Sequence, residues 1–389
     1  MTVVDQDRVA ALDEVRQHAR QIAQGFDHEY WADKDATGEY PWEFVKAFGE
    51  AGWLGAMIPE EYGGLGLGLT ESSIMLQEAA RSGGAAAASA LHFYIFPPGP
   101  VIRHGSEEMK REFLPQIAKG ELLMAFGVTE PTAGVDTSRI TTKAVKTDGG
   151  WVVNGHKIWI TNAQNAQRIL LLARTSPRNE EKPFEGMTLF FTELNRERIL
   201  VREIKKMARS AIDSNELFID DLFISDDQVV GEVGKGFSYL LDGLNPERIV
   251  VGMEMTGLGR AALDMAVRYA NERVVFDRPI GKNQAVAHPL ADSWIRLEAA
   301  ETICLKAAEL YDSKMPCGRE ANASKFLGSE AGFQACDRAM QTFGGYSYAK
   351  EYHIERLWRE SRLLKVAPVS QEMVLNYVST KVLGLPKSY

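Results

Sequence analysis

The spacing of apolar side chains divides the chain into three parts, and the first part is helical. Val9, Leu12 and Val15 recur at the three- and four-residue spacing of an amphipathic helix. The same spacing predicts further helices over residues 41–51, 70–82 and 107–119. The glycine-rich residues 58–68 interrupt them, but they lack the G-K-S/T sequence and the G-x-G-x-x-G spacing of nucleotide-binding loops. We therefore interpret them as a tight turn between two helices.

The middle part has the period of two that is typical of strands. Between about residues 122 and 231 short β-rich runs alternate with turn sequences such as Asp148-Gly149-Gly150 and Asn154-Gly155. We expect strands over residues 140–146, 151–153, 156–160, 168–173, 188–193 and 216–224. Several short strands with hairpin turns and no helices between them predict an antiparallel sandwich or barrel.

The third part is helical again. Asn245-Pro246-Glu247 has the form of a helix start, with Asn as N-cap, Pro at the first position and an acid in the first turn. We expect long helices over residues 249–275, 290–312, 319–343 and 370–383, a set consistent with a four-helix bundle. The prediction is an α+β multidomain protein with an N-terminal helical domain (1–121), a middle antiparallel β domain (122–231) and a C-terminal four-helix bundle (232–389).

Composition narrows the class of protein. The 389 residues are 45% hydrophobic and 25% charged, as expected for a globular chain of two or three domains. The net charge of −9 argues against nucleic acid as the main partner. We expect a cytoplasmic protein with no membrane partner, since neither a secretory signal nor an apolar run of about 20 residues is present. Cys304, Cys317 and Cys336 have no metal-binding spacing, so we predict no metal site.

The clearest candidate for chemistry is residues 126–136, F-G-V-T-E-P-T-A-G-V-D, where an apolar strand end runs into a turn. Its Thr, Pro, Gly and Asp residues interrupt strand pairing, which leaves backbone N–H groups available for other partners. They also place small hydroxyls beside those groups. Such a turn suits a planar heterocycle with a polar edge. An ordinary surface turn is the alternative, and composition alone favours that alternative.

Residues 126–136 also belong to a series of six motifs. The motifs are P-E-E-Y-G-G at 59–64, the stretch at 126–136, W-I-T-N at 159–162, G-K-G-F at 234–237, R-V-V-F at 273–276 with Gln284 following, and Q-T-F-G-G at 341–345. In this order, over nearly the whole chain, the series resembles the acyl-CoA dehydrogenase family of flavoproteins. The resemblance implies FAD as cofactor, fatty acid metabolism and a homotetramer or dimer.

The resemblance also implies a set of cofactor-binding residues, because FAD lies in that family between the β domain and the C-terminal helices. Phe126, Val128 and Thr129 would line the isoalloxazine ring, Trp159 would pack on it, and Thr161 would lie near its N5 atom. Taken alone, Trp159 is better interpreted as a core aromatic. The other implied cofactor residues, some of them contacting the FAD of a neighbouring subunit, are Ile160, Arg273, Val275, Phe276, Gln284, Gln341, Gly344, Gly345 and Ser370.

The family reaction needs a carboxylate base, because it removes the α-proton of an acyl-CoA thioester while the β-hydrogen leaves as hydride. Pro368 stands where most members have this glutamate, and proline cannot take a proton. A minority, the isovaleryl-CoA and long-chain types among them, have the glutamate before an arginine in the first long C-terminal helix. Glu247-Arg248 matches that pattern, so the resemblance implies Glu247 as the base. The alternative is that Glu247 only complements the helix dipole.

Three further positions are implied substrate contacts. Arg248 matches an arginine that helps to hold the substrate, Asn245 replaces an aspartate, and Val135 replaces a Ser or Thr. The expected function is FAD-dependent dehydrogenation of an acyl-CoA, with an electron-transfer flavoprotein as acceptor. Pro368 and Val135 motivate an alternative, a flavin enzyme of this fold with oxidase, monooxygenase or desulfinase chemistry. A non-catalytic DNA-associated relative is less expected, since the chain ends without a basic extension.

Overall fold

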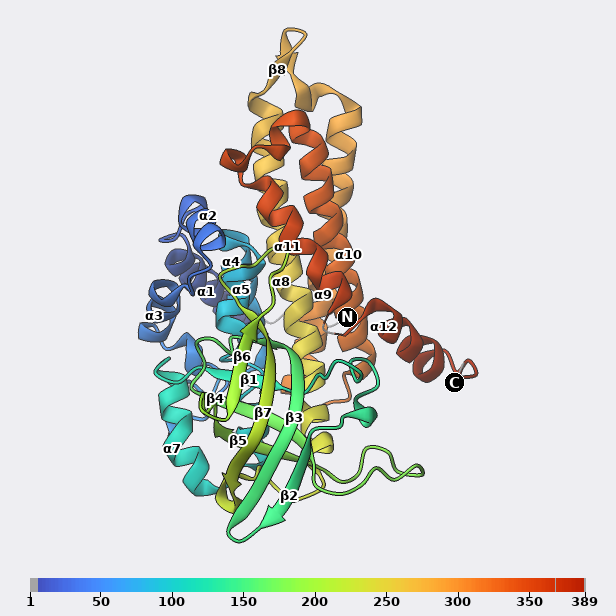
Figure 1. Ribbon diagram of the computed structural model, residues 1–389. Coiled ribbons are helices and arrows are strands. Elements are labelled where there is room, and N and C mark those ends of the chain that lie inside the picture. The colour runs from blue at the N-terminus through green and yellow to red at the C-terminus, as the bar shows by residue number, and fades with distance from the viewer. Residues whose placement is uncertain (1–5, 368, 388–389) are drawn as a thin grey trace.

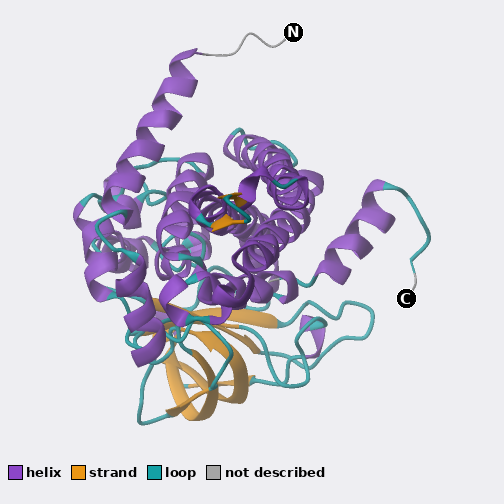
Figure 2. Cartoon of the chain, turned by 90° about the horizontal axis from the view of Figure 1, so that it is seen from above, coloured by secondary structure: helices purple, strands orange, loops and turns teal. Residues whose placement is uncertain are grey.

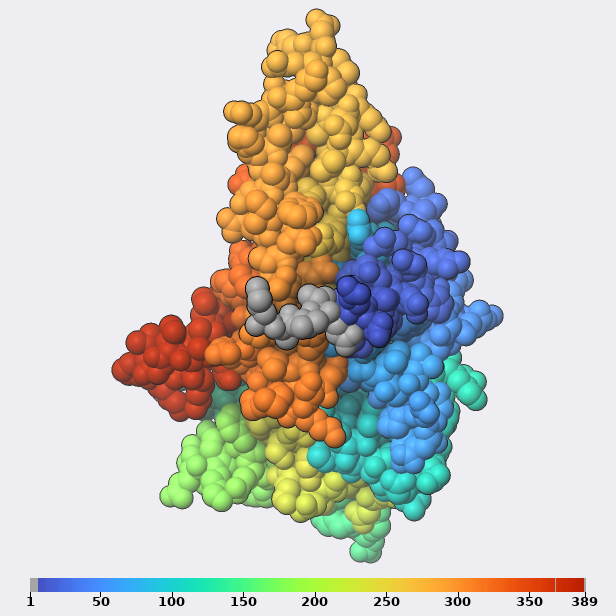
Figure 3. Space-filling model, turned by 180° about the vertical axis from the view of Figure 1, so that it is seen from behind, coloured from blue at the N-terminus to red at the C-terminus, as the bar shows by residue number. Residues whose placement is uncertain are grey.

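The computed structural model describes residues 6–367 and 369–387, and its helices and strands follow the three-part order that the sequence predicts (Figure 1). Seen from behind, the C-terminal helices form an elongated body above the β part, and the N-terminal helices pack along its side (Figure 3). None of the helices in the described ranges has the length and apolarity that a membrane crossing requires.

Seven helices form the N-terminal part. They are α1 (Gln6–Ala23), α2 (His28–Thr37), α3 (Trp42–Glu50), α4 (Leu69–Gly83), α5 (Ala85–His92), α6 (Gly99–His104) and α7 (Glu107–Ala118). Helix α4 is buried along almost its whole length, and it packs against α8 of the C-terminal part. The expected turn before α4 is confirmed: Glu60–Tyr62 form a short 3-10 helix, which Gly63 ends in the left-handed conformation.

A seven-stranded sheet forms the middle part. Its strands are β1 (Met124–Gly127), β2 (Lys143–Thr147), β3 (Gly150–Thr161), β4 (Arg168–Arg174), β5 (Met187–Glu193), β6 (Ile199–Glu203) and β7 (Ser214–Ser225). They are ordered β1-β4-β2-β3-β7-β6, with β5 also paired to β4. The sequence predicts an antiparallel sheet, whereas the sheet is mixed. Strand β1 runs parallel to β4, and a single residue pair joins β2 to β4 in parallel.

The expected turn at Asn154-Gly155 is wrong. Strand β3 continues through both residues with a shift in its register against β7. The amide of Asn154 donates to Asp221 Oδ1 and accepts from the Asp221 N–H, at 3.0 and 2.9 Å, so its polar groups are used between strands. Gly155 packs so closely on Thr142 that a Cβ there would lie 2.3 Å from the threonine hydroxyl. Asn154 and Gly155 therefore lie inside a long strand, opposite a bulge in β7, where three residues span the distance of two in β3.

The C-terminal part contains α8 (Gly236–Glu272), α9 (Gln284–Asp312), α10 (Gly318–Phe343), α11 (Ile354–Val366) and α12 (Gln371–Tyr377). A hairpin of β8 (Val274–Val275) and β9 (Arg278–Pro279) joins α8 to α9 at the far end of the bundle (Figure 1). The bundle is confirmed, but its fourth helix is α11 and not residues 370–383. Helix α12 and the π-helix Val378–Val382 instead project from the body (Figure 2).

The predicted helix start at Asn245 is also wrong. Helix α8 begins at Gly236 and runs through Pro246 without a break. Proline removes one N–H from the helix ladder, which leaves the carbonyl of Asp242 without its usual donor. Asp242 is exposed, so water can satisfy that carbonyl, and packing against α4 and α10 stabilises the helix beyond it.

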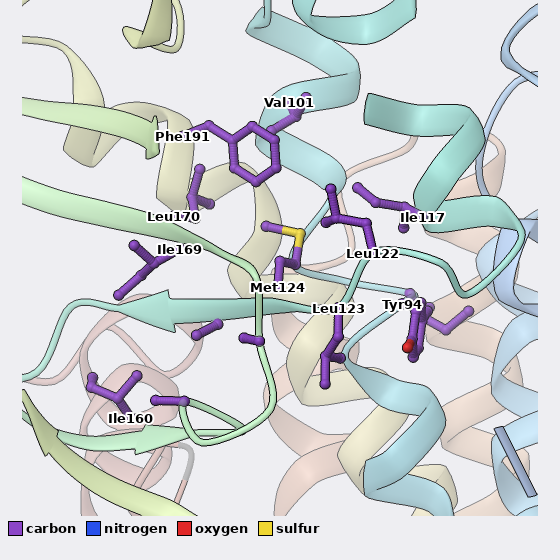
Figure 4. Close-up of a cluster of buried hydrophobic side chains, with 14 of the residues drawn as sticks. Tyr94, Val101, Ile117, Leu122, Leu123, Met124, Ile160, Ile169, Leu170 and Phe191 are labelled. Atoms are coloured by element: carbon purple, nitrogen blue, oxygen red, sulfur yellow. The ribbon is translucent and has the colours of Figure 1, made fainter. Parts of the chain in front are cut away.

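The core joins the sheet to the N-terminal helices. Leu122, Leu123 and Met124 lead into β1 and are almost fully buried against Leu170 and other side chains of the sheet and of α6 and α7 (Figure 4). A second cluster lies among the bundle helices. The start of β1 is therefore packed in the first of these clusters, and the turn that follows it begins from a buried strand.

Candidate functional site

The turn after β1 is fastened by a buried ion pair. Glu130 and Lys157 are 2% and 0% exposed, and Lys157 Nζ donates to Glu130 Oε1 at 2.9 Å and to the carbonyl of Val128 at 3.0 Å. Glu130 also accepts from the backbone N–H groups of Thr141 and Thr142, at 2.6 and 2.9 Å. Burial alone would raise the pKa of Glu130, but Lys157 and these hydrogen bonds outweigh burial and lower the pKa to about 2. This is a tethered turn and not an ordinary surface loop.

The W-I-T-N motif at 159–162 follows directly on a contact with this turn, because the N–H of the preceding Ile158 donates to the carbonyl of Thr129 at 2.9 Å. The pairing of β3 with β7 is interrupted between Lys157 and Ile160, and Trp159 lies in that interruption with φ 61°. Its indole is 57% exposed, so the core-aromatic interpretation is wrong. An exposed indole on a fixed backbone offers a flat face to a planar ligand.

Asn162, the last residue of the W-I-T-N motif, was not among the predicted site residues. It is fully buried with φ 62°, and neither its side-chain oxygen nor its side-chain nitrogen has a hydrogen-bond partner in the described structure. Buried amides without a protein partner are rare, and such groups in proteins are usually satisfied by an ordered internal water. Its place in the W-I-T-N motif was the available signal. The exposed Trp159 beside the tethered turn fits a large planar cofactor, whereas Asn162 lies beneath the surface.

The predicted cofactor residues fall into two separate groups. The group on β1, β3 and the turn lies at the sheet, whereas the β8–β9 hairpin lies at the opposite end of the bundle (Figure 1). At that end Phe276 is 91% exposed with φ 52°, and the Arg273 guanidinium lies 5.5 Å from the centre of the Tyr346 ring. One chain does not bring the two groups together. The second group comprises Arg273, Val275, Phe276, Gln284, Gln341, Gly344 and Gly345.

Glu247 lies about three turns into α8, since eleven residues separate it from Gly236. The helix-dipole interpretation, which needs a first-turn position, is therefore wrong. The half-buried carboxylate has neither a hydrogen bond nor a salt bridge within the described chain. Burial raises its pKa, and the nearby charges of His92, Arg248 and Lys325 offset this only in part. A free carboxylate with a raised pKa has the properties of a general base.

The predicted substrate residues are divided as well. Arg248 donates to the Asn245 side-chain oxygen at 3.1 Å, one turn away on α8, while its Nε is buried without a partner. Burial lowers the pKa of Arg248. Val135, in contrast, is 67% exposed at the tip of the turn after β1. Ser370 caps α12 by accepting from the Met373 N–H, and Pro368 lies outside the described residues.

A chain of side chains links Glu247's helix to the turn after β1. The ring of Phe126, in β1, contacts Phe96 at 5.5 Å between centroids, and Phe96 contacts His92 at 4.7 Å. His92 Nδ1 lies 2.6 Å from Oε1 of Glu254, two turns beyond Glu247 on α8. The fold therefore connects β1, which leads into the fastened turn, with α8, the helix that carries Glu247.

Comparisons with known proteins define the class. Models of the N-terminal, middle and C-terminal domains of acyl-CoA dehydrogenases match residues 10–121, 125–222 and 234–383. The chain therefore belongs to the acyl-CoA dehydrogenase family, and the predictions of family, of an enzyme and of the three-part fold are confirmed.

Individual relatives cover almost the whole chain. It is 37% identical over 370 residues, 94% of both chains, to "Acyl-CoA dehydrogenase FadE12" of Mycobacterium tuberculosis (strain ATCC 25618 / H37Rv). It is 32% identical over 354 residues, 90% of this chain and 93% of the relative, to "Caffeyl-CoA reductase-Etf complex subunit CarC" of Acetobacterium woodii. Its fold matches a glutaryl-coenzyme A dehydrogenase in complex with glutaryl-CoA with a TM-score of 0.92, at 28% identity and over 100% and 98% of the two chains.

Proposed function

We propose that this chain is an FAD-dependent enzyme that dehydrogenates an acyl-CoA thioester at its α,β-bond, with Glu247 as the base that takes the α-proton. The observation that carries the proposal is the environment of Glu247. Its carboxylate is half-buried, has no hydrogen-bond partner within the described chain and has a raised pKa. A base with these properties accepts a proton readily, because no partner must first be displaced and burial favours the neutral form.

The cofactor would be held mainly by residues of the sheet. Trp159 would cover a face of the ring system, and Thr129 and Thr161 would meet its polar edge. FAD, when bound, supplies the acceptor for the substrate's β-hydrogen. The exposed residues at the far end of the bundle would contact the FAD of a neighbouring subunit, which supports a homotetramer or dimer as the working form.

The substrate would be held at the Arg248 side of α8. The Arg248 side chain as a whole is only half-buried, and its guanidinium would donate to a carbonyl or phosphate oxygen of an acyl-CoA. Asn245 fixes the other end of the guanidinium. We further propose an electron-transfer flavoprotein as electron acceptor, in line with the relative that is named as part of an Etf complex.

A single experiment tests cofactor, substrate class and base together. The purified protein is expected to carry flavin, and a panel of acyl-CoA thioesters added without oxygen is expected to bleach the flavin absorbance. Glu247→Gln should slow bleaching by about 10²- to 10⁴-fold, the usual contribution of a general base, while flavin content stays unchanged. The control Glu309→Gln, at an exposed position of α9, should bleach like the wild type.

Three results would contradict the proposal. Equal bleaching rates for Glu247→Gln and the wild type would remove Glu247 from the mechanism. If no thioester bleaches the flavin, the substrate class is wrong. Fast oxygen consumption by the reduced flavin, with no thioester bound, would favour the oxidase or monooxygenase alternative over a dehydrogenase.

A further inference from the structure

A cleft between the N-terminal helices and the bundle takes no part in the proposed reaction. Its volume of about 420 Å³ lies within the range of pockets that hold small metabolites. The wall comes from α1, from the start of α2, from α4 and from the middle of α8. None of the lining residues belongs to the predicted flavin or substrate residues, so the cleft is a separate feature of the fold.

Each of these four helices contributes one basic side chain to the cleft. The four are Arg20 of α1, His28 of α2, Arg81 of α4 and Arg268 of α8. Ion pairs between helices are one reason for basic groups to converge, and they account for Arg20 and Arg81. They do not account for Arg268 and His28, whose side chains have neither a hydrogen bond nor an ion pair within the described residues.

The two paired arginines keep donors that no acid uses. Arg20 donates to Glu78 from Nε and Nη2, at 2.8 and 3.1 Å. Arg81 donates to Asp264 from its own Nε and Nη2, at 3.0 and 2.7 Å. The third nitrogen of each guanidinium, Nη1, has no hydrogen-bond partner in the described part of the chain. Since a guanidinium has five N–H groups, both arginines can bind a further acceptor.

Arg268 and His28 supply the other basic groups of the wall. Arg268 is exposed, and a single exposed arginine is common on protein surfaces. His28 is half-buried, and its ring stacks on that of His353 at 5.5 Å between centroids. Burial is the largest cause that lowers the pKa of His28 to about 4, the positive charges of Arg356 and Arg268 add to it, and Asp27 opposes them less strongly. The contribution of these cations indicates a positive potential at the wall.

The acids of the wall leave few acceptors for these donors. Both oxygens of Glu78 are used, since Oε1 also accepts from Arg16 at 3.0 Å. Asp264 uses Oδ2 and Asp27 uses Oδ1 for hydrogen bonds within the chain, so one oxygen of each remains. The wall therefore has more unused donors than unused acceptors. A ligand that only accepts hydrogen bonds, an oxyanion, fits such a wall.

We propose that this cleft binds a small phosphate-bearing anion, with Arg268 as its main contact and with Arg20 and Arg81 as further donors. The three guanidiniums come from three helices, which suits the several oxygens of a phosphate better than a planar carboxylate that one guanidinium satisfies. Phe26 and Met265 add apolar surface for the organic part of a phosphate ester. The bound anion would tie α1 and α4 to α8. This proposal goes beyond the proposed function and does not depend on it.

The test is calorimetric titration of the purified, flavin-loaded protein with inorganic phosphate, adenosine monophosphate and acetate. We expect saturable binding of phosphate or of the monophosphate at one site per chain. Tighter binding of the monophosphate would assign a phosphate ester as the ligand, and equal binding would assign free phosphate. Acetate binding as tightly as phosphate would overturn the choice of a phosphate group.

Arg268→Gln removes the unpaired guanidinium and breaks no ion pair of the described structure. It should weaken phosphate binding by at least about tenfold, the usual effect of losing a hydrogen bond to a charged group. The matched control is Arg198→Gln, at an exposed arginine between β5 and β6 whose side chain also has no partner in the described structure. Arg198→Gln should bind phosphate like the wild type.

A second readout locates the anion in the wild-type protein. Phenylglyoxal reacts with accessible arginine side chains, and mass spectrometry of the peptides measures its reaction at each position. Phosphate should protect Arg268 from the reagent, relative to chloride at the same ionic strength, and should leave Arg198 unprotected. Equal phosphate affinity of Arg268→Gln and the wild type, or an unprotected Arg268, would mean that the cleft only holds ion pairs between helices. Release of flavin by phosphate or by the monophosphate would assign the cleft to the flavin site, and that result too would overturn the proposal. Neither readout needs an acyl-CoA, so both remain decisive if no thioester bleaches the flavin.

Discussion

The ion pair beneath the turn after β1 gives the sharpest stability prediction. Lys157→Met keeps the length of the side chain but removes its charge, so the buried carboxylate of Glu130 loses its counter-ion and Val128 loses a donor to its carbonyl. Removing one partner of a buried pair costs about 3–5 kcal/mol. Glu130 keeps its hydrogen bonds from Thr141 and Thr142, so we expect a loss near the lower end, about 3 kcal/mol.

The measurement is the free energy of unfolding from denaturant titrations, together with the flavin retained after gel filtration. Lys157→Met should lower both, because the same lysine holds Val128 in the turn. The control Lys146→Met removes an exposed lysine that pairs with Asp226 at the surface, where a salt bridge contributes at most about 1 kcal/mol. It should leave flavin retention unchanged.

A double variant separates charge from packing. In Lys157→Met combined with Glu130→Gln no unpaired charge is buried, so the combined loss should be clearly smaller than the sum of the two single losses. The reasoning is refuted if Lys157→Met costs less than about 1 kcal/mol, or if the two losses are additive within about 0.5 kcal/mol.

Two other features give predictions that unfolding measurements can check. Gly257 lies where α8 crosses α4, and a Cβ there would lie 2.1 Å from the carbonyl oxygen of Gln77, so Gly257→Ala should destabilise the fold by at least about 1–3 kcal/mol. Gly243 lies in the same helix, but no atom lies within 4 Å of a Cβ placed there, so Gly243→Ala should stabilise the fold by about 0.5–1 kcal/mol. Similar effects of both variants would contradict the packing argument. Lys325 is fully buried with no hydrogen-bond partner for its Nζ in the described structure, and burial lowers its pKa from 10.5 to about 8. The unfolded chain therefore binds this proton more tightly than the folded chain. Below pH 8 the charged lysine lowers the free energy of unfolding by up to about 3 kcal/mol, and this loss decreases as pH rises from about 8 to 10.5. Lys325→Met should be more stable than the wild type at pH 7 by an amount that shrinks at pH 9, and a difference independent of pH would show that the charge is not its cause.

Much of the protein was predictable from local patterns in the sequence. The periods of apolar residues predict the helical, β and helical parts, since amphipathic faces must be buried wherever they lie in the fold. The six motifs, in their order along the chain, predict the family that the comparisons confirm. Glu247 was proposed as the base in the same way, through its arginine neighbour.

Errors arose where a local signal competed with packing. Asn245-Pro246 has the chemistry of a helix start, but α8 begins at Gly236, because burial against α4 and α10 outweighs the loss of one helix hydrogen bond. Asn154-Gly155 has the chemistry of a hairpin, but the neighbouring strand β7 pairs with β3 on both sides of it. The parallel pairing of β1 with β4 joins residues 44 apart and leaves no local trace.

The electrostatics of the candidate site depended on tertiary structure most of all. Lys157 did carry a readable signal, since it lies in phase with the buried Trp151 and Val153 of the same strand, and a lysine in such a position predicts a buried partner. That the partner is Glu130 could not be inferred, because the sequence contains many acids. His92 and Glu254 are 162 residues apart and carry no motif at all. The sequence alone determined which residue types are present and which elements carry them. Only the fold decided which charges lie beside Glu247, because charges interact through distance and burial and not through their order along the chain.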